Sequence, residues 1–278
     1  MPEVEAADGI ELYVEQHGTR KPGGYTILFS CPYSTTHANW LGQVEPMLGA
    51  GHGVLLWDFR GHGRSGIPAS QAGYSLDHVI DDMTRVLDWG APDEAVVLAG
   101  LSFGGLASLH FAHRHPTRVA ALVLANSGPG FKNPEAAADW KARSERTADF
   151  IETRGFEAFV TGKAAPTCIG RRPELPAAIA AAEAIKAQAP AGVANFGRYV
   201  AGLAPSIIDE LAEIEIPALV AVGGEDRAYQ RAAEVMASKL PRARCEVVEG
   251  AGHIVNIEAA DAFNALVLDF LGGLADSR

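Results

Sequence analysis

Apolar runs of strand length, separated by segments with helical spacing of apolar residues, constrain the fold of this chain most. The runs are continuous rather than alternating, which is typical of strands buried on both faces of a parallel sheet. The expected strands are 4–6, 12–16, 25–30, 53–58, 95–99, 119–125, 216–222 and 244–249. The expected helices among them are 76–87, which begins after the capping residue Ser75, then 103–115, 230–240 and 257–271. The sequence therefore predicts an α/β fold with a mostly parallel, eight-stranded sheet covered by helices on both faces.

Residues 130–213 differ from the rest of the chain. They are rich in alanine, contain no strand pattern and are punctuated by proline and glycine, which predicts a bundle of short helices. The alternation of strands and helices resumes after them. We therefore expect a core built from residues 1–129 and 214–278 and a helical cap formed by residues 130–213.

Composition excludes several classes of protein. Lys and Arg total 23 against 34 Asp and Glu, a net charge of −11, which disfavours binding to nucleic acid or to an anionic membrane. The three cysteines, Cys31, Cys168 and Cys245, are too scattered for a disulfide framework or a zinc site, so no metal is expected. Residues 1–9 lack the basic and apolar regions of a secretion signal, and no apolar stretch approaches about 18 residues. We expect a cytoplasmic protein with a small-molecule substrate; the sequence leaves the oligomeric state open, a homo-oligomer included.

The pattern G-x-S-x-G at 100–104 follows a predicted strand and opens a predicted helix. A strand that turns at once into a helix strains the central residue, and glycines relieve the crowding around it. Ser102 is thereby presented at the carboxyl end of the sheet. The unsatisfied N–H groups of the new helix lie beside it, so the N–H of Phe103 can meet a developing oxyanion.

A serine nucleophile needs a base, and the base needs an orienting carboxylate. Of nine histidines, His253 stands out because it follows one strand and precedes the last helix, which places it at the same sheet edge as Ser102. Asp226 occupies the equivalent position after the preceding strand. Strand-end loops of one parallel sheet converge, so the three residues can meet despite their separation in sequence.

Three motifs, at 57–66, 100–105 and 250–253, resemble those of the α/β-hydrolase fold superfamily, and the likeness covers essentially the whole chain. The resemblance implies Ser102 as nucleophile, His253 as base and Asp226 as orienting acid, with Glu225 as the nearest competitor for the acid. It also implies a helical cap inserted after the family's sixth strand, which matches 130–213, and a mechanism without a cofactor.

One loop departs from the common family pattern. Many relatives carry His-Gly where this chain reads Ser-Cys-Pro-Tyr-Ser-Thr-Thr at 30–36, a run similar to that of the 3-oxoadipate enol-lactone hydrolases. Pro32 has no N–H, so the second oxyanion donor is expected to be Tyr33. Cys31 either lines the pocket or is a small buried apolar residue.

Other side chains carry weaker expectations. Arg60 and His62 are expected to brace the loop at 57–66, and Arg171 and Arg172 to be solvated unless they pair with an anionic substrate. Trp140, Phe196 and Tyr199 are candidates for lining a substrate pocket, or else they form the cap's own small core.

The sequence thus predicts a cofactor-independent serine hydrolase that cleaves a small ester, lactone or similar acyl compound through an acyl-enzyme. The same residues serve carbon–carbon bond hydrolysis of a β-diketone or dienoic acid, cofactor-free perhydrolysis and acyl transfer. A ligand sensor of the same fold, which signals through a partner instead of turning over substrate, is the alternative outside enzymology.

Overall fold

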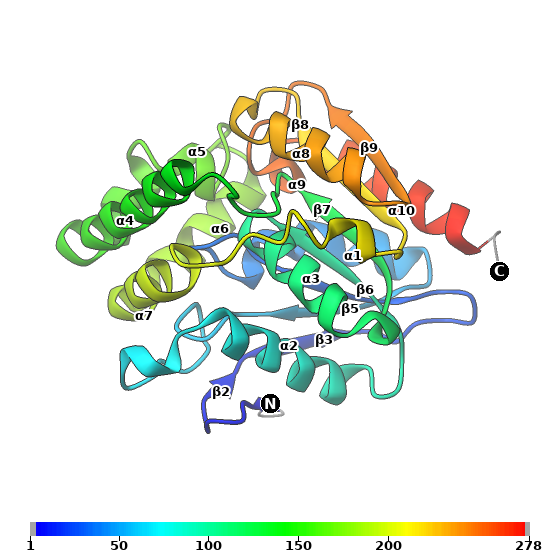
Figure 1. The fold of residues 1–278 in the computed structure, drawn as a ribbon, viewed down its shortest axis with the longest axis horizontal. Coiled ribbons are helices and arrows are strands. Elements are labelled where there is room, and N and C mark those ends of the chain that lie inside the picture. The colour runs from blue at the N-terminus through cyan, green and yellow to red at the C-terminus, as the bar shows by residue number, and fades with distance from the viewer. Residues whose placement is uncertain (1–3, 276–278) are drawn as a thin grey trace.

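A seven-stranded sheet forms the centre of the computed structural model, which describes residues 4–275 (Figure 1). The strands, in their spatial order, are β3 (Val14–His17), β5 (Gly53–Trp57), β4 (Thr26–Ser30), β6 (Val96–Leu101), β7 (Val119–Ala125), β8 (Ala218–Gly223) and β9 (Ala243–Val248). Only the edge strand β3 is antiparallel to its neighbour; every other pair is parallel. The predicted fold class, α/β with a mostly parallel sheet, is confirmed.

The expectation of eight strands in one sheet is wrong for the N-terminal segment. β1 (Val4–Glu5) pairs with β2 (Glu11–Leu12) in a separate two-stranded sheet. The cause is a tight turn, in which Gly9 takes a φ of 81° and the N–H of Gly9 bonds to the carbonyl of Ala6. The turn folds the first strand back on the second before it can reach the main sheet.

Helices connect the strands and cover the sheet. They are α1 (Leu41–Gly49), α2 (Leu76–Gly90), α3 (Phe103–Arg114), α4 (Pro134–Thr161), α5 (Ala165–Cys168), α6 (Pro176–Lys186), α7 (Pro190–Phe196), α8 (Arg227–Lys239), α9 (Val255–Glu258) and α10 (Ala260–Ala275). Helices α4 to α7, which lie between β7 and β8 in sequence, gather at the left of Figure 1, away from the end of α10. Within the described residues, no helix has the length and apolar character needed to span a membrane.

Two helix boundaries follow from local structure, one from a side-chain cap and one from a non-helical backbone conformation. Ser75 caps α2 as predicted, because its side chain accepts a hydrogen bond from the N–H of His78. The single helix predicted at 257–271 is instead broken at Ala259, whose φ of −137° and ψ of 51° are not helical. The break separates the short α9, whose Glu258 turns back to the N–H of Gly252 at 3.0 Å, from α10, which packs on α1.

The turn from β6 into α3 is packed without spare room. A Cβ atom placed on Gly104 would lie 2.2 Å from the carbonyl oxygen of Ser30, and one on Gly100 would lie 2.3 Å from the backbone of Gly104. Both distances are far inside van der Waals contact, and both neighbours are backbone atoms that cannot turn aside. The glycines of the G-x-S-x-G pattern are therefore steric requirements of the fold.

We predict that Gly104→Ala lowers the free energy of unfolding by about 3 kcal/mol, because a methyl group there must displace main chain. Gly42→Ala is the matched control, since a Cβ at Gly42, in the exposed first turn of α1, meets nothing within 4 Å. Urea unfolding monitored by circular dichroism measures both. Equal unfolding midpoints for the two variants would contradict the steric explanation.

Candidate functional site

Ser102 has a strained backbone at the carboxyl edge of the sheet. Its φ of 54° and ψ of −118° lie in a region that costs a non-glycine residue about 1–3 kcal/mol. Two hydrogen bonds hold this conformation, from the N–H of Ser102 to the carbonyl of Ala125 (3.0 Å) and from the hydroxyl of Ser127 to the carbonyl of Ser102 (2.7 Å). The side chain of Ser102 is thus presented in a half-buried position at the start of α3.

Asp226 and His253 meet at the same edge. Asp226 directly precedes α8 in the loop after β8, and His253 lies in the loop after β9. The carboxylate oxygen Oδ2 of Asp226 accepts a hydrogen bond from Nδ1 of His253 at 2.7 Å, and each residue is only 9% exposed. The carboxylate therefore fixes the ring orientation and leaves Nε2 as the nitrogen available to another group.

Asn126, at the end of β7, holds these two loops together. Its side-chain nitrogen donates to the carbonyl oxygens of Gly252 (2.7 Å) and His253 (2.6 Å), and its side-chain oxygen accepts from the N–H of Gly223 (2.7 Å). Asn126 is 1% exposed, so these bonds are shielded from water. Sequence reasoning missed this residue; the signal was a polar side chain at the end of a buried strand.

The hydroxyl of Ser102 is hydrogen-bonded to a residue that the sequence did not single out. Its Oγ lies 3.4 Å from the hydroxyl of Tyr229. The Tyr229 ring in turn contacts the His253 ring, with centroids 4.7 Å apart. Within the described part of the chain Ser102 and His253 make no hydrogen bond with each other, so the structure brings His253 to Asp226 and places Tyr229 beside Ser102.

The backbone N–H groups of Tyr33 and Phe103 donate no hydrogen bond to any described residue. They come from the loop after β4 and from the first residue of α3, the two segments that flank the Ser102 turn. The β4 loop is closely packed here, since Gly104 lies directly against its backbone at Ser30 and Cys31. Two unpaired donors thus lie on segments next to the serine.

A residue of the helical segment 130–213 secures the Tyr33 loop. The side-chain nitrogen of Gln188 donates to the carbonyl of Ser34 (3.1 Å), and its side-chain oxygen accepts from the N–H of Gly63 (2.9 Å). Close by, the backbones of Gly192 and Gly61 touch, because a Cβ on Gly192 would lie 2.4 Å from the carbonyl oxygen of Gly61. The helical segment is therefore fitted against the loops after β4 and β5.

His62 braces its own loop after β5, where its Nδ1 lies 3.3 Å from the carbonyl oxygen of Arg60, and it joins this loop to the loop after β4. Its Nε2 accepts a hydrogen bond from the N–H of Ser34 at 3.2 Å, and it is 1% exposed. Burial lowers the pKa of His62 to about 4, so the ring is neutral at pH 7 and can act as an acceptor. Arg60 braces the same loop through Asp82 and Asp8.

The pocket candidates have different surroundings. Phe196, fully buried, packs edge-to-face on Phe103 (5.1 Å between ring centroids), one residue from Ser102. Trp140 donates its indole N–H to the carbonyl of Ala201 at 2.7 Å, within the helical segment, and Tyr199 is half-buried in the same segment. Cys31 is 1% exposed, and burial raises the pKa of its thiol well above the usual value.

Arg171 is exposed, as expected of a surface residue, but it also makes an ion pair that the sequence did not predict. Its Nε donates to the buried carboxylate of Glu258 at 2.8 Å, and another guanidinium nitrogen donates to the carbonyl of Gly250. The same carboxylate accepts from the N–H of Gly252. A buried carboxylate needs a cationic partner, and Arg171 supplies it while tying the helical segment to the His253 loop.

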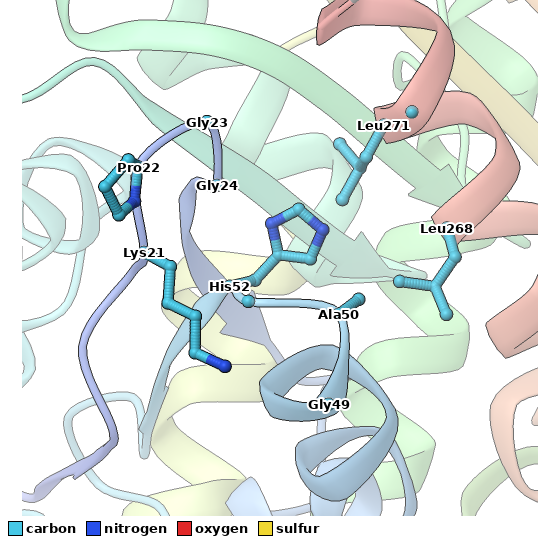
Figure 2. A pocket seen from close by; sticks show the side chains of 11 residues that line it. Lys21, Pro22, Gly23, Gly24, Gly49, Ala50, His52, Leu268 and Leu271 are labelled. Atoms are coloured by element: carbon cyan, nitrogen blue, oxygen red, sulfur yellow. The ribbon is translucent and has the colours of Figure 1, made fainter.

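Two cavities in the structure are lined by residues other than Ser102, Asp226 and His253. One, of about 440 Å³, lies between the loop 21–24, the end of α1 and α10 at the amino ends of the strands, with Lys21 and His52 as its titratable side chains (Figure 2). The other, of about 580 Å³, lies between Arg172, Leu175 and the start of α10. Among residues 4–275, no group of three or more His, Cys, Asp or Glu side chains is placed to hold a metal ion.

We predict that His62 makes the protein sensitive to mild acid. An unfolded histidine titrates near 6.5 and the folded one near 4, so the unfolded chain binds the proton first and stability falls as the pH drops between these values. Protonation of His62 should lower the free energy of unfolding of the wild type by up to about 3 kcal/mol over this pH range. His62→Gln keeps an acceptor for the N–H of Ser34 and should lack this pH-dependent loss of unfolding free energy. The measurement is urea unfolding of both proteins from pH 7 to pH 4; a constant difference between them contradicts the assignment.

The chain matches known proteins over nearly all of its length. It is 31% identical to the "Putative carbamate hydrolase RutD" of Variovorax paradoxus, with 94% of this chain and 96% of that protein covered. It is 29% identical to the 2-hydroxy-6-oxononadienedioate/2-hydroxy-6-oxononatrienedioate hydrolase of Cupriavidus pinatubonensis, covering 95% and 88%. Among solved structures, the enol-lactonase from Burkholderia xenovorans is 28% identical and superimposes with a TM-score of 0.82, covering 98% of this chain and 100% of that one.

The family match covers most strands of the sheet and the turn at Ser102. Residues 23–260 match the alpha/beta hydrolase fold family, a stretch that runs from just before β4 to the start of α10 and includes Ser102, Asp226 and His253. The resemblance inferred from the sequence motifs is therefore confirmed. The chain belongs to the alpha/beta hydrolase fold family.

Proposed function

We propose that this protein is a serine hydrolase that cleaves a small ester, lactone or similar acyl compound, with Ser102 as nucleophile, His253 as base and Asp226 as orienting acid. The observation that carries the proposal is the 2.7 Å hydrogen bond between Asp226 and His253 at the sheet edge where Ser102 occupies its strained turn. A carboxylate, an imidazole and a hydroxyl at one edge are the components of acyl transfer through a serine.

The first step requires the Ser102 hydroxyl to rotate from Tyr229 toward His253. Asp226 keeps the proton on Nδ1 of His253, so Nε2 is unprotonated and can take the proton of the serine. Oγ of Ser102 then bonds to the carbonyl carbon, and the carbonyl oxygen becomes an oxyanion. His253 passes the proton to the leaving group as the acyl-enzyme forms, and later activates the water that releases the acid.

Two backbone donors suit the oxyanion. The N–H groups of Phe103 and Tyr33 are unpaired and belong to the segments on either side of the serine turn. Because both are main-chain groups held by packing, they need no reorganisation as charge develops. The contacts of Gln188 and His62 with Ser34 support the proposal, since they fix the loop that carries Tyr33.

The helical segment 130–213 is proposed to act as a cap over the site. Gln188, Gly192 and Arg171 join it to three of the loops at the carboxyl edge, and Phe196 places an aromatic ring beside Phe103. A cap that is held by these contacts with the loops excludes bulk water from the acyl-enzyme. This arrangement suits a small substrate.

Carbon–carbon bond hydrolysis is the second candidate, and the likeness to the Cupriavidus hydrolase of a hydroxy-oxo-dienedioate favours it. The same serine would attack a ketone, and the bond broken would be to carbon rather than to oxygen. A substrate panel of p-nitrophenyl esters, enol-lactones, carbamates and β-diketones distinguishes the classes. Ester or lactone turnover well above that of the diketones supports the primary proposal, and the reverse order replaces it with the second candidate.

We predict that Ser102→Ala lowers turnover at least about 10³-fold while the fold is retained, because the attacking oxygen is removed. Initial rates on the best panel substrate measure the loss, and circular dichroism checks the fold. Ser238→Ala, at an exposed serine near the far end of α8, is the control, and it should leave turnover unchanged. Near-normal activity of the Ser102 variant would eliminate the assignment.

A p-nitrophenyl organophosphonate should attach one phosphonyl group to Ser102 and release one equivalent of p-nitrophenol. The reason is that only a serine activated by a base reacts quickly with such reagents. Intact-mass and peptide mass spectrometry locate the label. His253→Ala should slow the labelling strongly, and a label found on any other residue counts against an activated Ser102.

A further inference from the structure

Tyr229 lies at the centre of the proposed site although no motif contains it. Its hydroxyl is 3.4 Å from Oγ of Ser102, and its ring lies against the ring of His253 at 4.7 Å with a tilt of 36°. It therefore touches both the attacking oxygen and the base.

Tyr229 and Asp226 share one turn of backbone at the start of α8. The N–H of Tyr229 bonds to the carbonyl of Asp226 at 3.0 Å, three residues apart. From this turn the Asp226 side chain reaches Nδ1 of His253, and the Tyr229 side chain reaches Ser102. One rigid turn thus contacts both members of the proposed serine–histidine pair.

The hydroxyl of Tyr229 is suited to donate a hydrogen bond. Burial raises the pKa of Tyr229 above its usual value, an effect that outweighs the hydrogen bond with Ser102, and the nearby Asp226 carboxylate raises it further. The phenol stays protonated at neutral pH. It cannot serve as the base, and its proton is available to an oxygen that gains negative charge.

The position of Tyr229 relative to His253 indicates that the oxygen it can reach is the leaving-group oxygen. In the tetrahedral intermediate, the carbon attached to Oγ of Ser102 carries the oxyanion and the leaving-group oxygen. The proposed oxyanion donors belong to the segments of Tyr33 and Phe103, whereas the leaving-group oxygen must face His253 to receive its proton. The Tyr229 ring lies on the His253 side.

Resting on the function proposed above, we propose that Tyr229 is a further catalytic residue. Its hydroxyl holds Oγ of Ser102 in the free enzyme and donates a hydrogen bond to the leaving-group oxygen during acyl transfer. His253 alone carries the transferred proton, from Ser102 to the leaving group, and Tyr229 keeps its own. The residue therefore favours substrates whose leaving group is a weakly acidic alcohol, because such an alkoxide depends most on donors as the carbon–oxygen bond breaks.

The test compares Tyr229→Phe with the wild type on esters that share one acyl group and differ in the leaving alcohol, from p-nitrophenyl through phenyl to ethyl. Removing one hydrogen bond to a developing charge should lower kcat/KM about 10-fold or more for the ethyl ester and less than about threefold for the p-nitrophenyl ester. The dependence of log(kcat/KM) on the pKa of the leaving alcohol should therefore become steeper.

Tyr13→Phe is the matched control, because it removes a hydrogen-bonded tyrosine hydroxyl near Glu15 and Arg64, away from Ser102, and should leave the dependence unchanged. Labelling of Ser102 in Tyr229→Phe by the p-nitrophenyl phosphonate should proceed within about threefold of the wild-type rate, since that leaving group needs no donor. Such labelling shows that the variant is folded with its serine activated.

Three outcomes overturn the proposal for Tyr229: an equal loss across the ester series, no loss at all, or loss of phosphonate labelling. An equal loss means that Tyr229 only places the serine. Unchanged turnover by Ser102→Ala is a different result, because it refutes the proposed function itself and not merely the role of Tyr229.

Discussion

The backbone of Ser102, held in a conformation that serine avoids, is the constraint on which the site depends. A strand that becomes a helix within one residue leaves no space for a side chain two positions before or two positions after the turn residue, and Gly100 and Gly104 occupy these positions. The cost of the strain, about 1–3 kcal/mol, is met by the buried strands on both sides, which cannot shift without losing their ladder bonds. Hydrogen bonds from Ser102 to Ala125 and from Ser127 to Ser102 add to this hold.

Sequence reasoning reached the fold and the main candidate residues because their signals are local. Continuous apolar runs determine a parallel sheet, and a parallel sheet brings strand-end residues such as Asp226 and His253 to one edge. The N-terminal strands were misplaced because the pairing of Val4 with Leu12 depends on the turn at Gly9, which competes with the sheet edge. The ion pair of Arg171 was not expected because its partner, Glu258, is far away in sequence and the burial of Glu258 is not visible in the local pattern.

Tyr229 and Gln188 could not have been singled out for the same reason, because their local sequence context is ordinary. Asn126 was signalled only by its polar side chain at the end of a buried strand. The importance of all three comes from partners that only the tertiary fold provides. Asn126 joins the loops after β8 and β9, and Gln188 joins the loops after β4 and β5. The catalytic geometry proposed here thus rests as much on such polar cross-links as on the three residues that carry the chemistry.

The contact between Gly61 and Gly192 has a consequence for how this chain can diversify. The two backbones are in direct contact there, so neither position tolerates a side chain. The part of the helical segment around Gly192 therefore has to keep its present packing against the loop after β5. The long helix α4, by contrast, has many exposed positions, and its kink at Gly155 has open space around it. Substitutions that change the substrate preference are therefore expected in α4, whereas the contact between Gly61 and Gly192 is expected to stay unchanged.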